Sequence, residues 1–197
     1  MTEPDRIVAY DDDAPGPDET ETATFALGCF WGPDAAFGAR EGVVRTRVGY
    51  AGGEMADPTY HDLGEHSEAL QVDYDPTVVS FGELVALAIE NHDPRTQPRK
   101  RQYHHVLFFE TADQRAAIET HLDDRALDRV ETRIERLEAF HVAEPYHQKF
   151  NLRSERAVQS AFEAAGYDDA AVRESPAAAK LNAHVTGKRV PGIEAVL

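Results

Sequence analysis

The sequence predicts one domain of the α/β or α+β class, because segments with the period of strands and segments with the period of helices follow each other along the chain. Its 197 residues are enough for a single domain that buries an apolar core. The chain has no internal repeat with a period of roughly 20–50 residues, which excludes solenoids and propellers. No apolar run reaches about 18 residues, so no membrane-spanning helix is expected.

Four segments are predicted as strands, because apolar and polar residues alternate in them or because a short apolar run ends at a glycine or a turn. They are Thr22–Leu27, Val43–Tyr50, Ala69–Tyr74 and Val106–Phe109. A fifth segment, residues 127–137, fits both a strand and a helix, because its apolar residues satisfy both periods. Periodicity alone leaves both structures open there.

Six segments are predicted as helices, because their apolar residues are spaced three and four apart and capping residues precede several of them. Pro33 is typical of a first helical turn. Ser80 with Glu83 and Thr111 with Gln114 form two capping boxes. The predicted helices are residues 33–40, 80–91, 111–124, 144–151, 154–165 and 168–183.

The charge of the chain narrows its partners. It carries 36 acidic and 20 basic residues, a net charge of −16. Such a negative field repels nucleic-acid phosphates and anionic lipids, so neither nucleic acid nor a membrane is expected as a partner. High acidity with scarce lysine is halophile-like, since a hydrated, charged surface keeps proteins soluble in salt-rich cytoplasm. The first residues lack the basic and apolar regions of a signal peptide, so a cytoplasmic location is expected.

Residues 1–21 differ in composition from the remainder of the chain. They hold eight acidic residues, one basic residue and three prolines. Only Ile7–Tyr10 has apolar side chains that could dock on a core. The segment is therefore predicted to be an acidic N-terminal arm in a mostly extended conformation.

Cys29 is the only cysteine, which excludes an internal disulfide and any metal site built from several cysteines. A lone cysteine is often a small buried apolar residue. Cys29, however, lies between a predicted strand and a predicted helix, in Gly28-Cys-Phe-Trp-Gly32. Free N–H groups at a helix N-terminus stabilise a thiolate, so this position predicts a lowered pKa and a nucleophilic sulfur.

This motif resembles the active-site signature of the type A peptide methionine sulfoxide reductases. Further motifs match that family in the same order, namely Gly49-Tyr-Ala-Gly-Gly53, Pro58-Thr-Tyr60, His66-Ser-Glu68, Tyr74-Asp-Pro76, Asn91-His-Asp-Pro94, Gln102-Tyr103, Phe140, Ala143-Glu-Pro-Tyr-His-Gln148 and Ala179-Lys-Leu-Asn182. The resemblance implies a catalytic domain over residues 22–185, followed by a C-terminal tail, residues 186–197. It also implies an α+β roll, in which helices flank a mixed sheet and residues 130–137 form a strand.

The resemblance assigns two residues to the central chemistry. Cys29 matches the nucleophile that attacks the sulfoxide sulfur and becomes a sulfenic acid. Glu68 matches the acid that protonates the sulfoxide oxygen. To act as an acid near neutral pH, Glu68 needs a pKa raised by a partly buried, apolar surrounding.

Four aromatic residues match the family's substrate contacts. Tyr50 and Tyr103 match phenols that donate hydrogen bonds to the sulfoxide oxygen, and phenols remain donors at pH 7. Phe30 and Trp31 match the residues that hold the terminal methyl group. No catalytic role is assigned to His147. His104 and His105 are expected on opposite faces of a strand, so no metal site is predicted there.

The chain departs from the family pattern in two loops and is a shorter-loop, single-cysteine variant. Pro98 stands where many relatives have an aspartate, in a short loop made basic by Arg99, Lys100 and Arg101. These bases could attract an anionic substrate segment or an acidic thiol carrier, or simply be solvated. The segment before His66 is short as well, and Asp34 replaces a glutamate.

The function implied is the thiol-dependent reduction of methionine S-sulfoxide, free or in proteins, which repairs oxidative damage. The resemblance implies no bound cofactor and an external thiol reductant, either a thioredoxin-like carrier or a small thiol. A monomer is expected. Two alternatives remain open: a degenerate relative that binds oxidised methionine without turnover, and a cysteine hydrolase or transferase that pairs Cys29 with a histidine such as His147.

Overall fold

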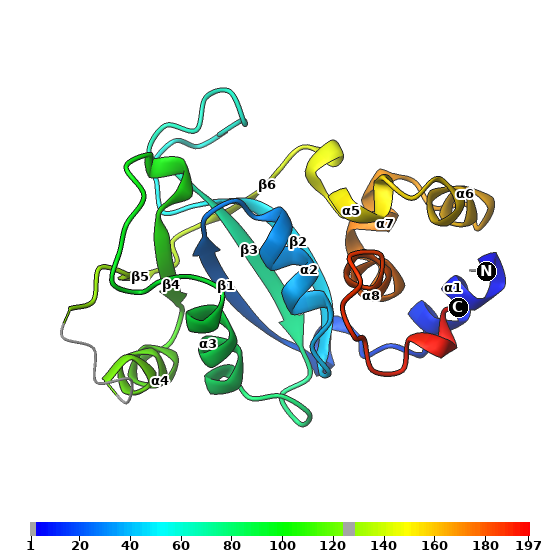
Figure 1. Ribbon diagram of the computed structural model, residues 1–197, viewed down its shortest axis with the longest axis horizontal. Coiled ribbons are helices and arrows are strands. Elements are labelled where there is room, and N and C mark those ends of the chain that lie inside the picture. The colour runs from blue at the N-terminus through cyan, green and yellow to red at the C-terminus, as the bar shows by residue number, and fades with distance from the viewer. Residues whose placement is uncertain (1–2, 124–128) are drawn as a thin grey trace.

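The computed structural model describes residues 3–123 and 129–197, and a six-stranded mixed sheet lies at its centre (Figure 1). The strands follow the order β5-β4-β1-β3-β2-β6 across the sheet. β4 and β5 are parallel, and the other neighbours are antiparallel. Their bounds are β1 Glu21–Leu27, β2 Val43–Ala51, β3 Ser67–Tyr74, β4 His105–Phe109, β5 Arg133–Arg136 and β6 Phe140–Val142.

Helices flank this sheet, which confirms the predicted fold class. In Figure 1, α2 and α3 lie against the sheet, while α1 and α5 to α8 gather beyond its β2 side, where both chain ends also lie. The helices are α1 Pro4–Asp13, α2 Trp31–Gly38, α3 Phe81–Glu90, α4 Ala112–Asp123, α5 Phe150–Arg153, α6 Arg156–Ala164, α7 Asp169–Glu174 and α8 Pro176–His184. None of the helices in the described residues is long and apolar enough to cross a membrane.

Two apolar layers cover the two faces of the sheet. The larger includes Phe25, Phe37 and Leu84, where α2 and α3 pack on the strands. The opposite layer includes Ala26 and Phe108. Because β1 is covered on both faces, its residues 23–27 are all buried. A central position of this kind makes the end of β1 a rigid support for the turn that follows it.

Most of the predicted elements are confirmed. The four predicted strands correspond to β1, β2, β3 and β4, and the open segment forms a strand at Arg133–Arg136, while its residues 127 and 128 lie outside the described part. α3 begins after Ser80, which caps it together with Glu83 as predicted. α4 begins after Thr111 as predicted, and residue 124, where the prediction ended it, is not described.

The prediction of an extended arm for residues 1–21 is wrong. Pro4–Asp13 forms α1, and Ile7 is fully buried in a cluster with residues of α6, α8 and the C-terminal segment. Asp11 accepts hydrogen bonds from the Ala177 N–H at the start of α8 (2.7 Å) and from the Tyr167 hydroxyl (2.9 Å). The acidic composition gave no indication of this helix, because it is held by the burial of Ile7 and the hydrogen bonds to Asp11, which are only two of its residues. The division into arm, catalytic domain and tail stays a prediction.

Two predicted helices are interrupted. Residues 144–151 form a 3₁₀ turn, Pro145–His147, and then α5, because Lys149 has a left-handed backbone (φ 52°). Residues 168–183 form α7 and α8, because Pro176 cannot continue a helix and instead occupies the first turn of α8. The first interruption places the His147 ring against Phe30, next to the candidate site.

Candidate active site

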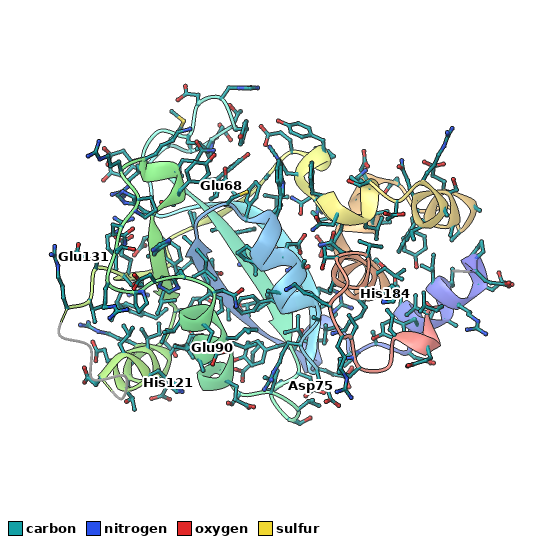
Figure 2. All side chains as sticks on the ribbon, in the orientation of Figure 1. Glu68, Asp75, Glu90, His121, Glu131 and His184 are labelled. Carbon is teal, nitrogen blue, oxygen red and sulfur yellow. The ribbon has the colours of Figure 1, made fainter. Side chains whose placement is uncertain are left out.

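Cys29 lies in the turn that joins β1 to α2, at the end of the sheet where Figure 2 labels Glu68. Gly28 has φ 84°, a left-handed conformation that a side chain would strain, so the turn requires glycine before the cysteine. Cys29 is exposed, whereas Phe30 beside it is 2% exposed. The turn therefore leaves Cys29 accessible to solvent and anchors the next residue in the interior.

The prediction of a lowered pKa for Cys29 is wrong. Partial burial of the thiol raises its pKa, the Trp31 backbone N–H lowers it, and the negative charge of Glu68 raises it further. The sum is a pKa above the ordinary value. The helix N-terminus does act as predicted, but burial and a neighbouring carboxylate outweigh it.

Glu68 lies in β3, directly opposite Tyr50 of β2, and is 1% exposed. One carboxylate oxygen accepts a hydrogen bond from the Phe30 N–H (3.1 Å), and the other accepts one from the Gln102 side-chain amide (2.6 Å). Burial raises the pKa of Glu68, although these two hydrogen bonds and the charge of Lys100 lower it in part. A raised pKa is the direction predicted for an acid.

Tyr50 is fully buried, and its hydroxyl donates a hydrogen bond to Glu144 (2.7 Å). Glu144 also accepts a hydrogen bond from the Tyr60 backbone N–H (2.9 Å). Burial acts to raise the pKa of Glu144, but the bonds from Tyr50 and Tyr60 lower it below its ordinary value. Burial and Glu144 together raise the pKa of Tyr50, so its phenol keeps its proton. Here that proton is directed to Glu144.

Tyr103 ends the 3₁₀ turn Arg101–Tyr103, which precedes β4 and is tied to β3 by the hydrogen bond from the Gln102 amide to Glu68. The pKa of Tyr103 is raised by burial first, then by the charge of Glu68 and by the Tyr60 phenol. The Lys100 ammonium lies 5.2 Å from the Tyr103 ring centre. Tyr103 is therefore a protonated phenol close to the carboxylate of Glu68.

The rings around Phe30 form an aromatic cluster. The Trp31 ring stacks on Phe150 at 3.8 Å, and the Phe30 ring meets the His147 ring edge-on at 5.2 Å. His147 is 2% exposed, and its two ring nitrogens have no hydrogen-bond partner within the described part of the chain. Burial lowers the pKa of His147, so the ring is neutral at pH 7. The cluster is an apolar wall suited to a methyl group.

The predicted site residues thus gather at one end of the sheet, but three neighbours were given no role: Gln102, Glu144 and His147. Gln102 donates a hydrogen bond to the Glu68 carboxylate, and Glu144 accepts one from the Tyr50 phenol. His147 packs between Phe30 and Tyr60. All three lie in motifs quoted above. Motif order could have named them, but only the structure shows what each one contacts.

A buried polar network holds α2 in place beneath the site. Asp34 is fully buried and accepts hydrogen bonds from the Thr46 hydroxyl and from the Asn182 amide (3.1 Å). The Lys149 ammonium, also fully buried, lies 3.8 Å from Asp34 and donates to the Thr46 carbonyl. Residue 34, a departure from the family pattern, therefore ties α2 to β2, α5 and α8.

Other chemistries find less support among the described residues. They contain no group of three or more histidine, cysteine, aspartate or glutamate side chains placed to hold a metal ion. No hydrogen bond joins the Cys29 sulfur to an imidazole in that part of the chain, and His147 meets Phe30 and Trp31 through ring contacts instead. The exposed Cys29 therefore adjoins the buried carboxyl group of Glu68, which accepts a hydrogen bond from the N–H of the next residue, Phe30.

Comparison with known proteins agrees with this geometry. The sequence pattern of the peptide methionine sulfoxide reductase family matches residues 21–178. A peptide methionine sulfoxide reductase of Drosophila melanogaster is 42% identical over 178 residues, which are 88% of this chain and 70% of the fly protein. A peptide methionine sulfoxide reductase of Methanothermobacter thermautotrophicus is 42% identical over 150 residues, or 69% of this chain and 89% of that protein.

A solved structure shows the same fold. Methionine sulfoxide reductase A of Corynebacterium diphtheriae superposes with a TM-score of 0.62 and 33% identity, over 72% of this chain and 77% of that one. Together with the thiol, the buried acid and the aromatic wall, these matches establish that the chain belongs to the peptide methionine sulfoxide reductase family, whose members reduce methionine sulfoxide.

Proposed function

We propose that this chain reduces methionine S-sulfoxide, in peptides and as the free amino acid, with Cys29 as nucleophile and Glu68 as acid. One observation carries the proposal. Glu68 is 1% exposed, burial raises its pKa, and its carboxylate accepts a hydrogen bond from the N–H of Phe30, the residue that follows Cys29. A buried acid of this kind remains protonated at higher pH than a solvated one, and can deliver a proton to a nearby oxygen.

The reaction balances as an oxygen transfer. The Cys29 sulfur attacks the sulfoxide sulfur while Glu68 gives its proton to the sulfoxide oxygen. Oxygen passes to Cys29, so methionine leaves as the thioether and Cys29 becomes a sulfenic acid. Sulfoxide sulfur is reduced by two electrons, and cysteine sulfur is oxidised by two. Protonation of Glu68 also removes the negative charge that raises the pKa of the Cys29 thiol. The thiolate is therefore favoured when Glu68 carries its proton.

The remaining groups have distinct tasks in this proposal. Phe30 and Trp31 hold the terminal methyl group against the aromatic cluster. Tyr103 donates its phenol proton to the sulfoxide oxygen as negative charge grows there. Tyr50 donates its hydroxyl hydrogen bond to Glu144 and so orients that carboxylate, which also accepts from the Tyr60 backbone N–H.

A stereochemical assay tests the proposal. With dithiothreitol as reductant, N-acetylmethionine S-sulfoxide is expected to yield N-acetylmethionine, and the R-sulfoxide is expected to persist. Chiral chromatography separates the two reactions. Reduction of neither isomer would support a binding protein without turnover, and equal reduction of both would remove the methyl-binding role of Phe30 and Trp31.

Recycling is expected to need an external thiol, because the chain has a single cysteine. One thiol displaces water from the Cys29 sulfenic acid to form a mixed disulfide, and a second releases Cys29 and carries away the disulfide. Without reductant, each enzyme molecule should reduce one sulfoxide and stop. Mass spectrometry should then find one added oxygen, which dimedone traps. Several turnovers in the absence of any thiol would contradict the scheme.

The basic loop is expected to favour anionic substrates. The test leaves Arg101 in place, because its guanidinium donates hydrogen bonds to the carbonyls of Glu65 (2.8 Å) and Gly52 (3.1 Å), whereas Arg99 and Lys100 are exposed. Reversing Arg99 and Lys100 to glutamate should raise KM for acidic sulfoxide peptides about 3- to 10-fold more than for neutral ones, and salt should erase the difference. Equal changes for both peptides would mean that the bases are merely solvated.

A further inference from the structure

A groove runs from the candidate active site toward α7. Its volume is about 600 Å³, within the range of sites that bind small ligands or peptide segments. The loop around Thr59 forms one wall, Val142 to Pro145 form the floor, and Asp168 to Ala170 with Arg173 form the other wall. None of these residues has a part in the oxygen transfer except Glu144, which marks where the groove begins.

The inner end of the groove is joined to the site through Glu144. This carboxylate lines the groove and is also hydrogen-bonded to the Tyr50 hydroxyl and the Tyr60 backbone N–H. The Tyr60 ring lies 4.7 Å from His147, which in turn contacts Phe30. A peptide whose sulfoxide occupies the site therefore finds this groove as a continuous path for the chain on one side of it.

The groove offers apolar contacts as well. Val142 lines it and is 44% exposed, and Tyr146, which follows the lining residue Pro145 in the chain, is 53% exposed. These two are among the few large apolar side chains exposed in the described residues. Val142 belongs to β6, the last strand at its edge of the sheet, where an extended segment can lie alongside. Exposed apolar groups at the mouth of a site favour a binding role.

The charged side chains at the outer end of the groove, near α7, determine which kind of substrate residue fits there. Asp168 and Asp169 are exposed there. Asp168 has only a backbone partner, the Ala171 N–H, among the described residues, and Asp169 shares its charge with Arg153 (2.8 Å). Arg173 pairs with Glu174 at 2.6 Å, a carboxylate that it shares with Arg47, and is not paired with Asp168 or Asp169 among the described residues. The outer end is therefore negative, in contrast to the basic loop near β4 at the other side of the sheet.

We propose that this groove, bounded by Thr59, Val142, Glu144 and Asp168–Asp169, binds the substrate segment next to the methionine sulfoxide and selects a lysine or arginine in it. The methylenes of that side chain lie on Val142, and its cationic head reaches Asp168 and Asp169. This inference rests on the proposed function and names its peptide preference. It places acidic flanking residues toward the basic loop and basic ones toward α7.

The test uses a peptide series. Short peptides carry one central methionine S-sulfoxide with lysine at one of the flanking positions, and glutamine replaces that lysine in the matched peptide. At one or two positions on one side of the sulfoxide, lysine should lower KM about 3- to 10-fold relative to glutamine, with kcat unchanged. A series without any preferred position would overturn the proposal.

Charge-removing variants locate the effect. D168N/D169N should abolish the advantage of lysine, and asparagine still caps α7 in place of Asp168. D113N/D123N, which removes two exposed carboxylates of α4, should retain it. Free N-acetylmethionine sulfoxide should give unchanged kcat/KM in both. If the advantage of lysine persists in D168N/D169N, the assignment is refuted. It is also refuted if the protein forms a dimer in solution that V142D dissociates, because a second copy of the chain would then fill the groove.

These outcomes separate the two proposals. If even the free sulfoxide is not reduced by the wild-type chain, the proposed function fails, and the peptide preference fails with it. If the free sulfoxide is reduced normally and lysine has no preferred position, only the groove assignment is lost. Thermal unfolding of each variant, compared with the wild type, shows whether α7 remains folded.

Discussion

Replacing Cys29 by serine is expected to abolish reduction of methionine sulfoxide while the fold persists. The hydroxyl of serine is a far weaker nucleophile than a thiolate, and serine has no sulfur atom that could be oxidised to a sulfenic acid. Because this is the only thiol in the chain, no second cysteine can substitute for it. Turnover of a sulfoxide peptide with dithiothreitol should fall by more than about 10⁴-fold.

The stability of this variant distinguishes chemistry from folding. Cys29 is exposed, so the loss of one sulfur atom leaves no cavity in the core. The melting temperature should therefore stay close to that of the wild type, and peptide binding should persist because Phe30 and Trp31 are unchanged. Activity within about tenfold of the wild type would exclude the sulfenic acid as the intermediate.

Replacing Glu68 by glutamine should lower turnover by roughly 10²- to 10⁴-fold, because the amide keeps the shape of the carboxyl group but has no acidic proton. The two hydrogen bonds around it can survive. The new amide oxygen accepts from the Phe30 N–H, and the Gln102 amide turns over to accept from the new NH₂ group. Stopped-flow measurement of the first turnover would isolate this step from recycling by thiol.

The pH profile gives a second readout of the same residue. Catalysis needs Glu68 protonated, so the wild-type rate should fall as pH rises through its pKa, which burial places above the ordinary carboxyl value. In Glu68→Gln this carboxyl titration should be absent, and only a steady decline should remain, because protonation of the sulfoxide oxygen by solvent decreases as pH rises. The deficit of the variant should also shrink toward acid pH, where solvent protonates the sulfoxide oxygen. An unchanged rate at pH 7 would assign the proton to another group, with Tyr103 first.

The rising limb of the profile belongs to Cys29. Its raised pKa means that the thiolate form increases as pH rises, in the direction opposite to protonated Glu68. The competent pair needs the thiol deprotonated and the carboxyl group protonated at the same pH, so the two titrations together set the pH range of activity. In Glu68→Gln the neighbouring negative charge is absent, so the apparent thiol pKa, followed by the rate of alkylation with iodoacetamide, should be lower than in the wild type.

The local sequence was sufficient to predict those helices and strands whose conformation depends on residues close together in the chain. The alternation in Val43–Tyr50 and the capping pair Ser80 and Glu83 predicted β2 and the start of α3, because strand burial and helix capping act over a few residues. The resemblance of motifs in order selected the residues of the site and the mixed sheet. It also favoured the strand that became β5, which periodicity had left open.

Composition misled where one or two side chains decided the outcome. α1 was expected to be extended because its segment is acidic, yet Ile7 and Asp11 fix it on α6 and α8. The helices at residues 144–151 and 168–183 were predicted too long. A left-handed Lys149 is favoured only by its buried contacts with Asp34 and the Thr46 carbonyl, which come from distant parts of the chain.

The sequence by itself supplied the candidate thiol, acid and aromatic residues, through the order of motifs that resemble the family. Only the tertiary structure decided their electrostatics. The helix N-terminus next to Cys29 predicted a lowered pKa. In the fold, burial raises the pKa values of both Cys29 and Glu68, and the charge of Glu68, which comes from β3, raises the pKa of Cys29 further. Likewise, only the fold joins Tyr50 to Glu144. Charge interactions depend on distance through space and on burial, and neither quantity is a property of sequence spacing.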